Sequence, residues 1–109
     1  MYHQPPAELP GFAVTVTTET LVVVLSGEFD VTSEDFLADR LAHLPLQRPR
    51  RLVFEATLVT FIDCASARLI VSTDRLLPPG VKPAILSPSP IVRRVLRSSG
   101  LSARCVLCG

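Results

Sequence analysis

The chain has 109 residues, of which 48% are hydrophobic and 19% charged, a composition typical of one globular domain and unlike that of disordered chains. The formal net charge of +1 gives no field of a single sign that would favour nucleic acid or an anionic membrane as a partner. No segment approaches the roughly 20 apolar residues that span a bilayer, and the N-terminus lacks the pattern of a signal peptide, so we expect a cytoplasmic protein. Prolines 5, 6 and 10 predict a flexible leader over residues 1–11, followed by one domain over 12–109.

Two strands begin the predicted domain. Apolar and polar residues alternate over 14–18, which indicates a half-buried strand. Residues 20–25 end in five consecutive apolar side chains, the pattern of a buried central strand. The short interval between these segments predicts a hairpin, and Ser26-Gly27 predicts the end of the second strand.

A helix and a third strand follow. Thr32 or Ser33 can act as the N-cap of a helix whose apolar residues recur at helical spacing up to Leu44. Residues 52–54 predict a strand that can continue to residue 58, with a loop after it.

The C-terminal half predicts two more helices and two more strands. Residues 64–77 show helical spacing, and Pro78 stops that helix. After a short apolar strand over 84–86, Ser89 can cap a third helix, and a last strand is expected over 105–107. The resulting order, β-β-α-β-α-β-α-β, predicts an α/β fold in which helices cover the sheet.

Three segments carry a resemblance to a known family. Residues 25–30 read L-S-G-E-F-D, residues 59–63 read V-T-F-I-D, and residues 87–96 read S-P-S-P-I-V-R-R-V-L before Gly100-Leu101. In this order and spacing they resemble the STAS family, named for sulfate transporters and anti-sigma factor antagonists, and in particular its stand-alone bacterial antagonists. The resemblance covers residues 12–107 and implies a mixed, mainly parallel β-sheet with packed α-helices.

The resemblance also implies a function. Such antagonists bind an anti-sigma factor of the GHKL serine-kinase type, which then releases its sigma factor, so the expected protein regulates transcription by protein binding and is not an enzyme. The partner would meet two loops that follow the second and third strands. The residues placed there by the family motifs are Gly27, Glu28, Asp30, Thr32, Asp63, Cys64 and Ser66.

This sequence departs from the family at the phosphorylated serine. The family's S-S-G after the aspartate becomes Cys64-Ala65-Ser66, so the position of the phosphoacceptor holds a thiol, which a serine kinase does not phosphorylate. Ser66 is a poor substitute, because two residues further along a helix its side chain points elsewhere. We therefore expect an antagonist that binds without the usual phosphoserine.

The aspartates allow a structural and a functional interpretation. Asp63 lies where a strand gives way to a helix, so it can cap that helix, present a partner surface, or do both. For Asp30, ordinary turn chemistry is the alternative to a partner contact.

The cysteines leave a redox role open. Cys64 at a helix N-terminus can be reactive or a small inert filler, and Cys105 and Cys108 have C-x-x-C spacing. A zinc site needs four ligands, which this chain barely supplies, so no metal is expected. Residues three apart on a strand face opposite sides, so no direct disulfide between Cys105 and Cys108 is expected either. The alternative function is a thiol-based redox-responsive STAS regulator or scaffold that uses Cys64 or the Cys105/Cys108 pair. No nucleotide-binding loop or catalytic triad motif occurs, and we expect no cofactor.

Overall fold

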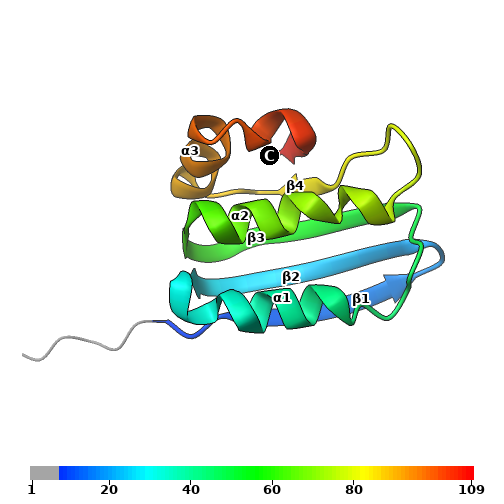
Figure 1. The fold of residues 1–109 in the computed structure, drawn as a ribbon, viewed down its shortest axis with the longest axis horizontal. Coiled ribbons are helices and arrows are strands. Elements are labelled where there is room, and N and C mark those ends of the chain that lie inside the picture. Colours follow the sequence, from blue (N-terminus) through cyan, green and yellow to red (C-terminus); the bar gives the residue numbers. More distant parts are fainter. Residues whose placement is uncertain (1–7) are drawn as a thin grey trace, which may run out of the picture.

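The computed structural model of this chain describes residues 8–109, which form one layer of strands and one layer of helices (Figure 1). Most of the predicted leader, residues 1–7, lies outside the described residues. The strands are β1 (Gly11–Thr17), β2 (Thr20–Phe29), β3 (Arg51–Ile62), β4 (Ala84–Leu86) and β5 (Val106–Cys108). The helices are α1 (Glu34–Ala42), α2 (Cys64–Val71) and α3 (Pro90–Ser98), with 3₁₀ turns η1 (Val31–Ser33), η2 (Ser72–Leu76) and η3 (Leu101–Arg104).

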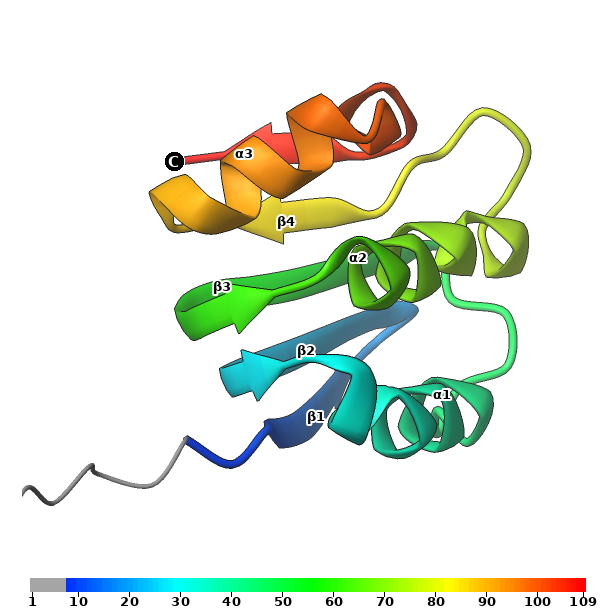
Figure 2. The same ribbon diagram turned by 60° about the vertical axis from the view of Figure 1, so that its left-hand side comes forward.

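The sheet follows the chain without a crossover. Its strand order is β1-β2-β3-β4-β5, with β1 antiparallel to β2 and all later neighbours parallel. Parallel strands joined in sequence by right-handed connections place every connecting helix on the same side. Figures 1 and 2 show α1, α2 and α3 together on one face of the sheet. The predicted fold class and the predicted order of elements are confirmed.

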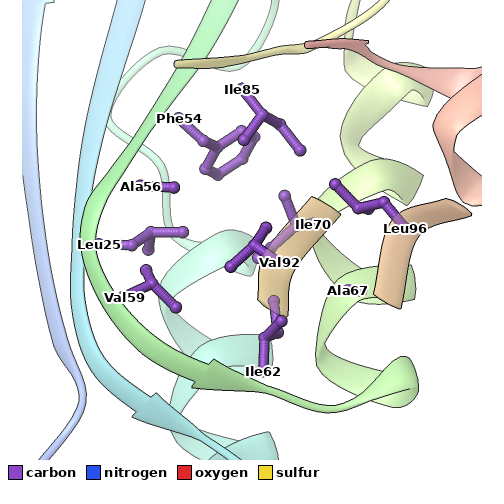
Figure 3. Close-up of a pocket in the computed structure, with 10 residues that line it drawn as sticks. All are labelled: Leu25, Phe54, Ala56, Val59, Ile62, Ala67, Ile70, Ile85, Val92 and Leu96. Carbon is purple, nitrogen blue, oxygen red and sulfur yellow. The ribbon is translucent and has the colours of Figure 1, made fainter. Parts of the chain in front are cut away.

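The core lies between the sheet and the three helices. Along β2 the residues facing the helices, such as Leu21, Val23 and Leu25, are buried, and those between them are only half-buried. Phe54 of β3 is fully buried at the centre of this layer. A small apolar cavity of about 10 Å³ remains between β3 and helices α2 and α3 (Figure 3). It is close to the smallest volume that holds one water and is too small for an organic ligand.

Two strand ends differ from the sequence prediction. Strand β2 does not end at Ser26-Gly27 but continues to Phe29, because Gly27 adopts φ 79° at a shift of register and the pairing with β3 resumes beyond it. Likewise β3 runs without a loop to Ile62, since its last residues pair with the extended end of β2. Pairing with a neighbouring strand thus extends both strands past their local stop signals.

The remaining boundaries are close to those expected. The helix expected over 64–77 is α-helical only to Val71 and continues as the 3₁₀ turn η2. Ser89 caps α3, as predicted, by accepting a hydrogen bond from the backbone N–H of Val92. The last strand lies one residue later than expected. Within residues 8–109, no helix is long and apolar enough to cross a membrane.

Candidate partner-binding site

The carboxyl ends of β2 and β3 lie side by side. Phe29 pairs with Ile62 at the last position of each strand, and the backbone N–H of Asp63 donates to the carbonyl oxygen of Phe29 at 3.0 Å. Asp30 directly follows Phe29, and Asp63 directly follows Ile62. The pairing of the two strands therefore brings the two predicted loops to one edge of the sheet. Ligands of open α/β sheets commonly bind at this edge.

Asp30 organises the turn that follows β2. Its Oδ1 atom accepts hydrogen bonds from the backbone N–H of Thr32 at 2.9 Å and from the hydroxyl of Thr32 at 2.6 Å. The Ser33 hydroxyl in turn accepts from the backbone N–H of Asp30 at 2.9 Å, which completes a capping box around η1. The hydrogen bond from the Thr32 hydroxyl, together with those from nearby backbone N–H groups, lowers the pKa of Asp30.

The predicted N-cap of the first helix, Thr32 or Ser33, is confirmed in position at Ser33 but not in its capping hydrogen bond. Ser33 occupies the N-cap position of α1, but its side chain makes no capping hydrogen bond there. A 3₁₀ turn precedes the α-helix, and its cap is Asp30. Sequence spacing gives no sign of this extra turn, because Asp30 and Ser33 are both good capping residues.

Asp63 caps α2 as expected. Its Oδ1 atom accepts a hydrogen bond from the backbone N–H of Ser66 at 2.7 Å, and its carbonyl oxygen accepts from Ala67 at 3.0 Å. The cap fixes the backbone of the first turn and leaves the side chain of Cys64 exposed at the first helical position. Asp63 thus fixes the position of the segment that begins at Cys64.

Ser66 points into the protein. Its side chain is 0% exposed, and its hydroxyl has no hydrogen-bond partner among the described residues. It packs with the inward-facing residues of α2 and does not share the surface of Cys64.

Gly27 and Glu28 belong to β2 and not to a loop. Gly27 is buried, and a Cβ atom on it would overlap the carbonyl oxygen of Leu9. The backbone N–H of Glu28 donates to the carbonyl oxygen of Glu8 at 3.3 Å, and the Thr60 hydroxyl donates to the carboxylate of Glu8 at 2.9 Å. Residues 8–10 therefore cross the end of β2, which sequence reasoning did not foresee.

Two exposed apolar residues accompany the aspartates. Val31 follows Asp30 in η1 and is 74% exposed, and Phe61 near the end of β3 is 38% exposed. Neither was singled out from the sequence. An apolar residue between two capping residues was the available signal for Val31, since turns are usually polar.

Comparison with known proteins shows the family to which this chain belongs. The family model of the STAS domain matches residues 12–106. The chain belongs to the STAS domain family. None of the curated proteins with which it was compared matches it.

Solved structures confirm the STAS fold. An anti-sigma factor antagonist from Mycobacterium paratuberculosis matches with a TM-score of 0.79 at 21% identity, over 92% of this chain and 86% of that one. SpoIIAA in its unphosphorylated form matches with a TM-score of 0.68 at 22% identity, over 91% of this chain and 89% of that one. The Bacillus cell fate determinant SpoIIAA in its phosphorylated form gives a TM-score of 0.64 at 24% identity, over 91% and 92%.

The three cysteines of this STAS domain lie in different surroundings. Cys64 is exposed, Cys108 on β5 is half-buried, and Cys105 is buried just before β5. Burial raises the pKa of the Cys105 thiol, which donates weakly to the carbonyl oxygen of Leu101 at 3.6 Å. Within residues 8–109 no three or more His, Cys, Asp or Glu side chains are grouped so that they could hold a metal ion.

Proposed function

We propose that this STAS domain is an anti-sigma factor antagonist that binds an anti-sigma factor of the GHKL serine-kinase type in the cytoplasm and so releases a sigma factor. The observation that carries the proposal is that β2 and β3 end side by side at one edge of the sheet. Asp30 and Asp63 follow these two ends directly. Antagonists of this class share the fold over about nine-tenths of the chain, which supports the assignment.

The proposed binding face consists of Asp30, Val31, Thr32, Asp63 and Cys64. Both aspartates accept backbone hydrogen bonds, so the two turns are held in one conformation before any partner arrives. A preorganised surface loses less conformational entropy on binding. Exposed Val31, which follows Asp30 in the chain, adds an apolar side chain to the face, and protein interfaces commonly combine apolar and polar groups.

The other residues assigned to this face by family motif act from behind it. Gly27 lets residues 8–10 pass close to β2. Ser66 lies on the buried face of α2. Glu28 is half-buried and pairs with Phe61 near the carboxyl ends of β2 and β3.

Binding in this proposal does not depend on phosphorylation. The exposed position at the start of α2 holds Cys64, whose thiol is no substrate for a serine kinase, and the nearby Ser66 hydroxyl is buried. The antagonist would therefore stay competent to bind while the kinase is active.

Binding to the anti-sigma factor tests the proposal. The purified chain is used to capture the kinase from lysate of its host, and the affinity of the purified pair is then measured by calorimetry. Asp63→Asn keeps an oxygen that can cap α2 but removes the charge, so we expect binding at least about fivefold weaker than wild type. Glu19→Gln removes one negative charge at the opposite edge and should bind like wild type. Equal binding by all three proteins would overturn the proposed face.

Phosphorylation by the captured kinase tests the regulatory part. With labelled ATP, wild type should remain unlabelled, and Cys64→Ser should become labelled, because it places a hydroxyl at an exposed position. Label on Ser66 of the wild type would contradict constitutive binding.

A redox-responsive regulator is the second candidate, favoured by the exposure of Cys64 alone among the three thiols. Alkylation followed by mass spectrometry gives the rate at each cysteine near neutral pH. A Cys64 rate well above that of a free thiol supports a reactive site, and a rate no higher than a free thiol counts against it.

A further inference from the structure

The end of the molecule opposite the aspartates carries two adjoining hollows. Three connections return there to the amino ends of the parallel strands. Two of them, between α1 and β3 and between η2 and β4, lie at the right-hand end of Figure 1, and the third is η3 before β5. The two hollows adjoin each other, since both have Arg75, Leu77, Pro78 and Pro79 in their walls. We call them together the basic groove.

Positive charge dominates the basic groove. Among the described residues its walls contain four basic side chains, Arg48, Arg75, Lys82 and Arg104, and one carboxylate, that of Asp74. Asp74 is already neutralised, because its two oxygens accept hydrogen bonds from the Arg104 guanidinium at 3.1–3.3 Å. The whole chain has a net charge of only +1, so this is a local concentration of charge.

The walls between the charges are apolar and stiff. Leu77 is buried, and Pro78 and Pro79 follow it with restricted backbones. Val81 beside them is 37% exposed, so the walls include an accessible aliphatic side chain. A ligand that fits this groove has negative charges for the basic side chains and apolar groups for the prolines and Val81.

We propose that the basic groove docks an acidic, extended segment of a partner protein in which apolar residues are interspersed. Charge complementarity draws the segment in, and the rigid apolar walls add contact without an entropy cost in the groove itself. This site is distinct from the face around Asp63 and does not rest on the proposed antagonist function.

The same chemistry argues against nucleic acid as the occupant. Proteins that bind single strands place aromatic side chains where bases stack, and none of the described residues in the walls of either hollow is aromatic. Prolines and a valine suit aliphatic side chains instead.

Fluorescence anisotropy with a labelled peptide tests the proposal. The probe is a peptide of about 12 residues built from Glu and Asp with interspersed Leu, long enough when extended to follow both hollows. Three proteins are compared: wild type, Arg75→Glu/Lys82→Glu in the groove, and Arg94→Glu/Arg97→Glu on the exposed side of α3. The two double variants carry the same change of charge, and circular dichroism checks that each is folded.

We expect the wild type and the α3 variant to bind the probe with similar affinity, and the groove variant to bind about tenfold more weakly. Binding should weaken as salt is raised. No binding by wild type, or equal loss in both variants, would overturn the proposal. Tighter binding of a single-stranded oligonucleotide with the same variant pattern would also overturn it, in favour of nucleic acid.

Discussion

Two aspartates each combine a structural task with an exposed position. Asp30 and Asp63 use one carboxylate oxygen to accept backbone hydrogen bonds in the turns after β2 and β3. Among residues 8–109 the other oxygen of each carboxylate accepts no hydrogen bond, which leaves it available to a partner. Structural and functional interpretations of these residues are therefore compatible.

The hydrogen bond by which Asp63 caps α2 contributes measurably to the stability of the domain. Asp63→Ala removes the acceptor for the backbone N–H of Ser66, so we expect the free energy of unfolding to fall by about 1 kcal/mol. In Asp63→Asn the free energy of unfolding should fall by much less, since the amide oxygen can still accept the hydrogen bond from Ser66. Urea denaturation of the three proteins measures both values. If Asp63→Asn lost as much unfolding free energy as Asp63→Ala, the charge of Asp63 and not its capping hydrogen bond would matter for stability.

Asp30 makes stability depend on acid pH. Its pKa is lower in the folded protein than its usual value, so its contribution is fully present above that usual value and is lost as the pH falls through the folded pKa. Asp30→Asn keeps an acceptor for Thr32 but does not titrate. Between about pH 6 and about pH 2.5, urea denaturation should show a smaller loss of stability in Asp30→Asn than in wild type. The contribution of Glu55, whose pKa is also lowered, is common to both proteins. An equal loss would contradict the role of Asp30.

Strand β2 is interrupted and then continued. A register shift and the positive φ of Gly27 bend the strand, and residues 8–10 lie against it so closely that no side chain fits. The bulge therefore allows β2 to reach Phe29 and to bring Asp30 beside Asp63.

Gly27→Ala tests this element. We expect the free energy of unfolding to fall by roughly 1–3 kcal/mol, because the new methyl group strains the backbone and displaces Leu9. Gly80→Ala is a matched control: Gly80 has φ 82° but open space around it, so only strain of about 1 kcal/mol is expected. Thermal and urea unfolding give both numbers. Equal losses would mean that the contact with Leu9 contributes nothing.

At the scale of the whole molecule, one face of the sheet supplies the core. All three helices cover the same face, and the buried apolar residues gather there (Figures 1 and 2). Small domains of this size have a net stability of only about 5–15 kcal/mol, so single residues in this layer matter.

Two phenylalanines of β3 show the difference between the faces. Phe54 is fully buried, so Phe54→Ala should cost about 3–5 kcal/mol and leave the domain partly unfolded at 37 °C. Phe61→Ala changes an exposed side chain and should cost under about 1 kcal/mol. Differential scanning calorimetry compares the two melting temperatures with wild type. Similar shifts would contradict the one-sided core.

Much of the fold could be predicted because its signals are local. The apolar run over 20–25, the capping residues Ser89 and Asp63 and the break at Pro78 gave the order of elements. The ends of β2 and β3 could not be predicted, since hydrogen bonding between the strands overrides the local stop at Gly27. The extra turn capped by Asp30 was missed for a related reason: neighbouring capping residues compete, and only the packed structure selects one.

The candidate site divides in the same way. Residue types and their spacing were enough to predict that Asp30, Asp63 and Cys64 follow strands and that a cysteine, not a serine, comes directly after Asp63. Three features could be found only from the folded chain: Ser66 is buried, Val31 is exposed, and the walls of the two adjoining hollows at the opposite edge contain Arg48, Arg75, Lys82 and Arg104. The physical reason is that residue types and spacing set local conformation, whereas exposure and proximity depend on how distant segments pack.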